Sequence, residues 1–320
     1  MKYQRLIFAF AAITAIGILY DKYKEKYEPN EVTTNFNLIE RHLLKSEKNG
    51  KPNLWVHTDY NVNARNWLSF YSRNTTDLNQ PYVNMCIETI VKWCGNSFNI
   101  CLINDDSFEK LLDNWTIELD NVPEPLRRRT RVLGIFRLMH KYGGVLLPNS
   151  FLMMRDFKPI HDEYLGNKDA YTAEVATSND SSDVTRLFPT HKIVGCKKDS
   201  KVVRDLCNYL EVNLSTDSTA ESDFKGNIDR MLFKHVNNGA MNIIPANLIG
   251  VKDVHDEVIL LDDLMGETKV DFDNNMIGVY IPKCQLMKRR NYHWFVRMSK
   301  RQIVSSNVIL GRLFKLSYTN

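Results

Sequence analysis

This sequence lacks the cysteine pattern that is typical of a zinc site or a disulfide framework. No C-x-x-C pair and no Cys/His cluster occurs among its six cysteines, Cys86, Cys94, Cys101, Cys196, Cys207 and Cys284. This dispersed spacing argues against a structural zinc. It is more typical of buried free thiols in a reducing compartment than of disulfides. Four N-x-S/T matches are expected by chance in so asparagine-rich a chain, so they do not decide the compartment.

The chain also lacks a strong excess of charge of one sign. Its 42 Lys and Arg stand against 38 Asp and Glu, for a net charge of +4. The two signs are mostly mixed along the chain, whereas a nucleic-acid-binding surface needs clustered Lys and Arg. One local exception is RRRTR, Arg127–Arg131. This run favours a solvated helix face over a phosphate or partner site.

Internal repeats and low-complexity linkers are absent as well. The chain has 320 residues, of which 43% are hydrophobic and 25% charged, an ordinary composition for a globular protein. This length predicts one large domain, or two small domains that share a core.

The longest uncharged run covers only 15 residues, Leu6–Tyr20. As a helix it would span about 22 Å, short of a bilayer core of about 30 Å. Tyr3 and Tyr20 stand where interfacial aromatic residues belong, and the flanking Lys and Arg side chains can extend toward the headgroups. We therefore expect an uncleaved membrane anchor.

Two alternatives stay open for this segment. Ala15-x-Gly17 is a passable cleavage site, so the run could be a signal peptide, and it could also be a buried core helix. Basic residues flank the run on both sides, so the positive-inside rule gives no orientation. The predicted organisation is an anchor at 1–26, a polar stalk at 27–52 and a folded domain at 53–320.

The folded part alternates between strand and helix patterns. Leu54–Tyr60 and Phe98–Asp105 are predicted core strands, and Pro81–Gly95 between them is a predicted helix with proline at its start. Glu124–Tyr142 predicts a longer helix, which a double glycine ends before a short apolar strand. Further strands are predicted at 169–175, 191–197, 241–251 and 277–282, and helices at 107–115, 200–214 and 223–239. This order predicts an α/β fold with an open, mostly parallel sheet and helices on both faces.

Polar residues stand at the ends of the first three predicted strands. Sheets of this kind bind ligands outside the carboxyl ends of their strands, so these residues are expected at one cleft. Asp105 and Asp106 could hold a nucleotide ribose or a metal, or Asp106 could simply begin the next helix. His57 and Asp59 could equally be loop residues. Pro148-Asn149-Ser150 ends the third strand and completes the predicted cleft.

Five segments in the right order resemble the glycosyltransferases with a DXD sugar-binding region, of the capsular polysaccharide synthesis type. They are LWVHTD, NARNWLSFYSRN, QPYVNMCIETIVKWCG, FNICLINDDSF and KYGGVLL. The resemblance covers Leu54–Met154 and extends more weakly to Trp294. It implies a GT-A-like nucleotide-diphospho-sugar transferase fold that moves a sugar from a nucleotide donor to a glycan acceptor with Mn²⁺ or Mg²⁺. The chain is also similar to sequences of large DNA viruses.

The departures from the family pattern affect the metal and the nucleotide. Val132 and Ile135 stand where the family has Asp and Arg, and Pro148-Asn149-Ser150 stands where it has D-x-D. A cation that bridges a diphosphate needs hard oxygen ligands, commonly carboxylates. The asparagine carbonyl and the serine hydroxyl are poor substitutes. We therefore expect no metal and no other cofactor, with Mn²⁺ or Mg²⁺ only if the site is active after all.

Other side chains could still belong to such a cleft. His293 matches a histidine near a tryptophan in the family's C-terminal part, although a packed aromatic pair is favoured there. Basic residues could replace the cation, and Arg65, Arg73 and Lys141 are the candidates. Arg137 does not replace the family's arginine, because two positions along a helix correspond to about 200° of rotation.

Two classes of function follow. The favoured one is a membrane-anchored glycosyltransferase-like protein with a degenerate metal and nucleotide-sugar site. It is expected to be inactive and to act as a structural or interaction component of a virion membrane or of a glycan-making assembly. The alternative is an active, metal-independent hexosyltransferase that uses a nucleotide sugar and a glycan acceptor. The expected partners are the membrane and other structural proteins, but no nucleic acid.

Overall fold

The computed structural model describes residues 50–58, 80–124, 126–176, 187–216 and 226–319. The predicted anchor and residues 27–49 of the predicted stalk, together with Asp59, Arg65 and Arg73, lie outside these ranges. Within them, no helix is both long and apolar enough to cross a bilayer.

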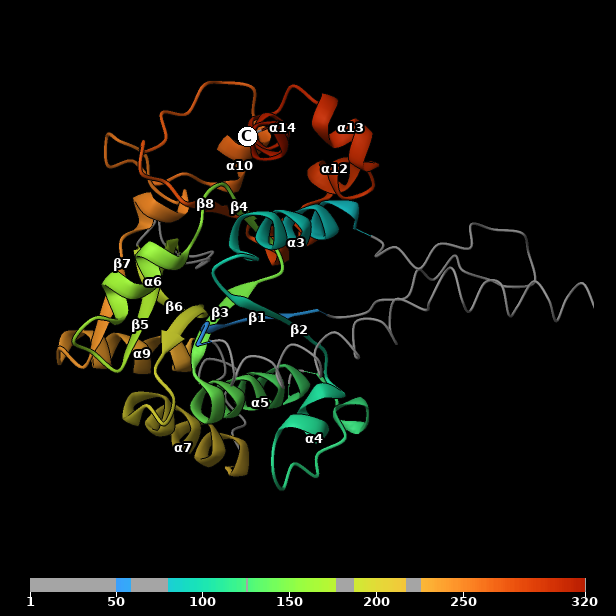
Figure 1. The fold of residues 1–320 in the computed structure, drawn as a ribbon. Coiled ribbons are helices and arrows are strands. Elements are labelled where there is room, and N and C mark those ends of the chain that lie inside the picture. The colour runs from blue at the N-terminus through green and yellow to red at the C-terminus, as the bar shows by residue number, and fades with distance from the viewer. Residues whose placement is uncertain (1–49, 59–79, 125, 177–186, 217–225, 320) are drawn as a thin grey trace, which may run out of the picture.

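A six-stranded sheet lies at the centre of the molecule (Figure 1), with the strand order β2-β1-β3-β6-β5-β7. Its strands are β1 Asn53–His57, β2 Asn99–Ile103, β3 Gly144–Pro148, β5 Ala170–Ala176, β6 Leu187–Cys196 and β7 Met241–Ile244. β1 runs parallel to β2 and β3, and β5 runs parallel to β7. Only β6 is antiparallel to its neighbours in this sheet. The prediction of a mostly parallel sheet is confirmed.

The strand register brings the ends of the first three strands together. His57 is level with Ile103 on one side and with Pro148 on the other. We call the edge of the sheet at which β1, β2 and β3 end the carboxyl edge. Because β6 is antiparallel to β3, its first residues enter the sheet at this same edge.

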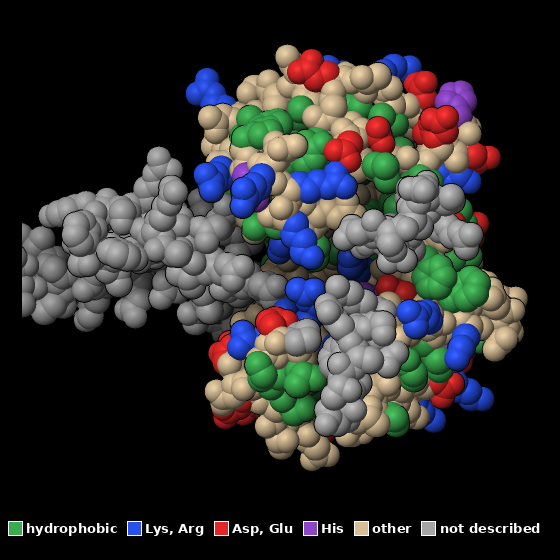
Figure 2. All heavy atoms as spheres, turned by 180° about the vertical axis from the view of Figure 1, so that it is seen from behind, with side chains coloured by type: hydrophobic (Ala, Val, Ile, Leu, Met, Phe, Trp, Pro, Cys, Tyr) green, Lys and Arg blue, Asp and Glu red, His purple; other side chains and the backbone are tan. Residues whose placement is uncertain are grey.

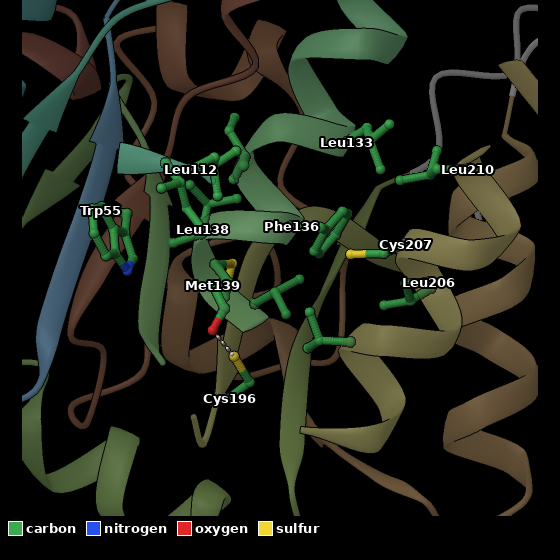
Figure 3. Close-up of a cluster of buried hydrophobic side chains, with 14 of the residues drawn as sticks. Trp55, Leu112, Leu133, Phe136, Leu138, Met139, Cys196, Leu206, Cys207 and Leu210 are labelled. Atoms are coloured by element: carbon green, nitrogen blue, oxygen red, sulfur yellow. Dashed lines mark hydrogen bonds between the residues drawn. The ribbon is translucent and has the colours of Figure 1, made fainter. Parts of the chain in front are cut away.

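Helices cover both faces of the sheet (Figure 1). One face carries α5 Leu126–Tyr142, α7 Lys201–Ser215 and α9 Asn227–Asn237, and the other carries α3 Pro81–Cys94 and α6 Lys158–Leu165. On the first face, Leu133 and Phe136 of α5 point toward Leu210 and Cys207 of α7 (Figure 3). The apolar run of β3 is buried on both faces, as expected of a central strand between two helix layers.

A smaller layer lies against α3. Its two antiparallel strands are β4 Phe151–Met153 and β8 Gly278–Tyr280. Around them pack the C-terminal helices α10 Leu261–Met265, α11 Lys283–Lys288, α12 His293–Val296, α13 Lys300–Ser305 and α14 Ile309–Thr319. Phe295 and Phe314 are fully buried in this second core. The remaining short helices are α4 Ser107–Leu111, η1 Leu119–Asn121, η2 Ala246–Ile249 and η3 Arg290–Tyr292.

Two predicted elements are shorter than expected. The helix predicted at 107–115 ends at Leu111, because the chain turns to an extended conformation at Leu112. The strand predicted at 241–251 ends at Ile244, where Pro245 has no N–H to continue the ladder. The prediction of buried free thiols is confirmed for five cysteines, whereas Cys284 is exposed.

The double glycine between α5 and β3 is a place where only glycine fits. Both residues have positive φ, 68° at Gly143 and 109° at Gly144. A Cβ on Gly144 would lie 2.2 Å from the carbonyl oxygen of Asn53 in β1. The indole of the buried Trp55 donates a hydrogen bond of 2.9 Å to the carbonyl of Gly143. The turn is thereby fixed against the neighbouring strand.

We expect Gly144→Ala to destabilise the fold by about 3 kcal/mol, from backbone strain together with the clash against β1. Gly50→Ala is the matched control, because Gly50 also has positive φ, 64°, but has open space around it. The control should cost only about 1 kcal/mol. Urea unfolding of the two variants measures the difference, and equal destabilisation would contradict the close approach.

Candidate functional site

Three charged or polar side chains form a hydrogen-bonded cluster at the carboxyl edge. Asp105, two residues beyond β2, accepts from both sides. The Arg131 guanidinium donates to its two oxygens at 2.7 and 2.6 Å, and the ring of His57 lies 2.8 Å from Oδ1. His57 also stacks on Phe108, with ring centroids 6.0 Å apart. All three members of the cluster are largely shielded from solvent, with side chains 10–21% exposed.

The charge of Asp105 is stabilised by this cluster. Burial raises the pKa of the carboxyl group, but the hydrogen bonds and charges of Arg131 and His57 outweigh burial and leave the pKa far below its usual range. Asp105 is therefore an anion that orients two donors. Its oxygens already accept three hydrogen bonds, which leaves little capacity for a metal ion.

The centre of the carboxyl edge is the turn between β3 and β4. Pro148 is level with His57 in the neighbouring strand. Ser150 is buried, and its hydroxyl donates to the carbonyl of Ile281 at 2.8 Å, while the N–H of Ile281 donates back to Ser150 at 3.1 Å. Ser150 therefore ties β4 to the segment after β8. Asn149, between Pro148 and Ser150 in the sequence, is half-buried.

These residues do not fit a divalent metal ion. Pro148 offers no side-chain ligand, and the hydroxyl of Ser150 is engaged elsewhere. Among the residues that the structure describes, no group of three or more His, Cys, Asp and Glu side chains is arranged to hold a metal. Hard cations need several oxygen ligands, commonly including carboxylates, and this turn supplies only the Asn149 amide oxygen and backbone carbonyls.

The start of β6 brings a second polar cluster to the same edge. His191 donates its backbone N–H to Asp229 at 2.9 Å, and its ring nitrogen lies 2.7 Å from the same oxygen. The ammonium of Lys192 donates to the hydroxyl of Tyr280 at 2.8 Å. Burial raises the pKa of Asp229, but the contacts with His191 outweigh it, and the pKa is lowered.

Lys192 lies close to the central turn of the edge. Val194 and Leu146 form the last pair between β6 and β3, and Lys192 lies two residues beyond it, toward the carboxyl edge. Its partner Tyr280 pairs with Phe151, which directly follows the turn at 148–150. Burial lowers the pKa of this ammonium, but the contact with Tyr280 outweighs burial and raises it. An ammonium carries three donors. Figure 2 shows Lys and Arg side chains along the hollow between the C-terminal helices and the α5 side of the molecule.

The structure separates the other predicted residues from this edge. His293 lies in α12, one of the C-terminal helices of the smaller layer, where its ring contacts the carbonyl of Met287 at 2.9 Å. Lys141 lies at the end of α5, away from the carboxyl edge, and pairs with Asp113 at 2.8 Å. Asp106 is exposed at the start of α4, as the helix-start alternative predicted.

Two positions at which the sequence departs from the glycosyltransferase pattern, 132 and 135, face the core. Ile135 is 7% exposed in the cluster between α5 and the sheet, and Val132 packs against the same cluster. Arg137 points away from the sheet and pairs with Glu211 of α7 at 2.7 Å, as its helical angle predicted. The arginine that reaches the edge is Arg131, which the sequence placed on a solvated face.

The residues that sequence reasoning missed carry weak local signals. Arg131 is one of four arginines in a five-residue run, and only its contact with Asp105, 26 residues away, distinguishes it. Lys192 lies within a predicted strand, where a lysine near a strand end is usual. Asp229 lies in the first turn of α9. An acidic residue is favourable at that place in any helix, so it does not indicate a site.

Comparison of the chain with protein-family models finds no match, and comparison with curated proteins finds none. Among solved structures, one similar chain is described as "PaToxG Glycosyltransferase". It is 9% identical, with a TM-score of 0.31, and the match covers 64% of this chain and 81% of that one.

We expect Asp105→Asn to destabilise the protein by about 2 kcal/mol, because it removes the charge-assisted hydrogen bonds between this carboxylate and the shielded Arg131. The folded pKa of Asp105 lies below the unfolded value of about 3.9. Its contribution is therefore present above that value and is lost as pH falls toward the folded pKa. The variant should show a weaker fall in stability below about pH 4.

Asp113→Asn is the matched control, because Asp113 is 83% exposed in its ion pair with Lys141. Such exposed pairs contribute little to stability. Urea unfolding from pH 2.5 to 7 compares the three proteins. A similar pH dependence of stability in wild type and Asp105→Asn would refute the role of the cluster.

Proposed function

We propose that this chain is a membrane-anchored glycosyltransferase-like protein of GT-A type whose cleft holds no metal, and that it acts as a non-catalytic structural or interaction component. The observation that carries this proposal is the turn at 148–150. There, a proline and a serine engaged with Ile281 occupy the strand end at which a metal-dependent transferase needs carboxylates.

The arrangement of the sheet supports a ligand cleft at this place. Parallel strands place polar side chains at one edge, and open α/β sheets bind ligands outside that edge. Two histidines and two cationic side chains reach the edge described above, His57, His191, Arg131 and Lys192. Arg131 is paired with Asp105 and His191 with Asp229, whereas Lys192 donates to the neutral hydroxyl of Tyr280. Lys192 therefore favours an anionic ligand, such as the diphosphate of a nucleotide sugar.

The remaining parts of the proposal rest on the sequence. Anchoring rests on the uncharged Leu6–Tyr20 run with its basic and aromatic flanks. A place in a virion or in a glycan-making assembly rests on the resemblance of Leu54–Met154 to the family and to viral sequences. Loss of the catalytic metal site leaves such a domain its surface and its cleft, which suit an interaction component.

A second candidate function is metal-independent sugar transfer, which the position of Lys192 favours. A fixed cation can stabilise charge that develops on a departing diphosphate, as a metal ion does elsewhere. Lys192 donates to Tyr280, which pairs with Phe151 directly after the turn at 148–150, and this contact fixes its ammonium. In this alternative the donor is a nucleotide sugar and the acceptor is a glycan.

Calorimetry on the full chain tests the role of metal. We expect no Mn²⁺ binding at micromolar concentrations, and no turnover of uridine or guanosine diphospho-sugars that depends on added metal. A sample treated with a chelator is the control for carried-over ions. Micromolar Mn²⁺ binding would overturn the proposal, and metal-independent turnover would decide for the second candidate.

Lys192→Met tests whether this lysine contributes to an anion site. We expect the wild type to bind a nucleoside diphosphate without metal and the variant to bind it at least about tenfold more weakly, since hydrogen bonds to charged groups contribute about 1.5–3 kcal/mol. Lys197→Met is the control, because Lys197 follows the other end of β6 and its ammonium donates to Gly166. Equal affinities of wild type and Lys192→Met would exclude Lys192 from the site.

A further inference from the structure

Positive charge is concentrated in the last part of the chain. Residues 283–320 contain nine Lys and Arg and no Asp or Glu, whereas the whole chain has 42 basic and 38 acidic residues. The rest of the chain therefore carries a net negative charge. This segregation is much stronger than the overall net charge of +4 suggests.

One contiguous stretch presents this charge together with apolar side chains. In the segment 287–297, Met287 is 39% exposed and Trp294 is 43% exposed. Lys288, Arg290 and Arg297 of the same segment are also exposed. We call these five side chains the 287–297 face.

The 287–297 face is held by the core beneath it. Leu286 and Phe295 flank its exposed residues and are fully buried among the C-terminal helices. The ring of His293 also contacts the carbonyl of Met287, so the end of α11 is fixed against α12. The exposed tryptophan and the cations therefore project from a packed surface.

Carboxylates compensate only part of this charge. Asp262 pairs with Arg289 and accepts a hydrogen bond from Tyr292, and Glu88 pairs with Lys300. Within the ranges that the structure describes, no ion pair joins Lys288, Arg290 or Arg297 to an acidic side chain. These three cations are available to an external anion.

We propose that the 287–297 face docks on the surface of an anionic lipid bilayer. Each basic side chain near such a surface strengthens binding about fivefold. Tryptophan is suited to the headgroup region, and a methionine beside it can enter the apolar boundary. A nucleic acid or an acidic protein would match the cations but gives no reason for the exposed methionine in the same segment, Met287.

Fluorescence of the full chain with brominated lipids provides a specific test. Residues 1–26 contain no tryptophan, so quenching by brominated acyl chains does not report on the predicted anchor. Among the described residues, Trp55 and Trp115 are buried and Trp93 is half-buried, which leaves Trp294 as the exposed reporter. We expect quenching in vesicles that contain phosphatidylglycerol, little quenching in phosphatidylcholine alone, and loss of the effect in Trp294→Phe.

The triple variant Lys288→Gln, Arg290→Gln, Arg297→Gln should lose most of this quenching, as should wild type in 0.5 M NaCl. The matched control replaces three exposed lysines outside the C-terminal helices with glutamine, Lys198, Lys201 and Lys234. It should behave as wild type. Equal quenching in neutral vesicles, or full quenching of the first triple variant, would overturn the proposal. So would a shift of Trp294 emission by heparin without any response to vesicles, because the partner would then be a soluble polyanion.

Discussion

The close packing of the double-glycine turn against β1 determines where the central turn of the carboxyl edge lies. Gly144 approaches the carbonyl of Asn53 more closely than any residue with a Cβ could. Trp55 then fixes the turn by its hydrogen bond to Gly143. These contacts set β3 in register with β1, so that Pro148 comes level with His57. The position of this turn thus depends on contacts at the opposite end of β3.

Electrostatics at this edge differ from those of a metal site. A metal site collects carboxylates and relies on the ion to neutralise them. Here Asp105 is neutralised by Arg131, and Asp229 by His191 if that ring is protonated. The ammonium of Lys192 donates to a neutral hydroxyl, that of Tyr280. Lys192 thus brings a fixed cation to this edge, and such a cation would suit an anionic ligand without a bridging ion.

Much of the sheet, but little of the charge arrangement, could be predicted from the sequence. β1, β2 and β3 are apolar runs with sharp ends, and such local patterns are the main sequence signal of a strand. Arg131 stands among other arginines, and its selection by Asp105 depends on how α5 is placed over β2. The position of Lys192 depends on the antiparallel entry of β6, a long-range pairing that no local pattern encodes.

Two positions at which the sequence departs from the glycosyltransferase pattern have structural roles in this fold. Ile135 fills the core between α5 and the sheet, where an arginine would bury an unpaired charge. Ser150 joins β4 to Ile281 through a buried hydroxyl, and an aspartate there would place a carboxylate against the Ile281 carbonyl oxygen. An arginine at position 135 or an aspartate at position 150 is therefore expected to destabilise the fold. Ile135 and Ser150 thus support the packing of the sheet and of its carboxyl edge.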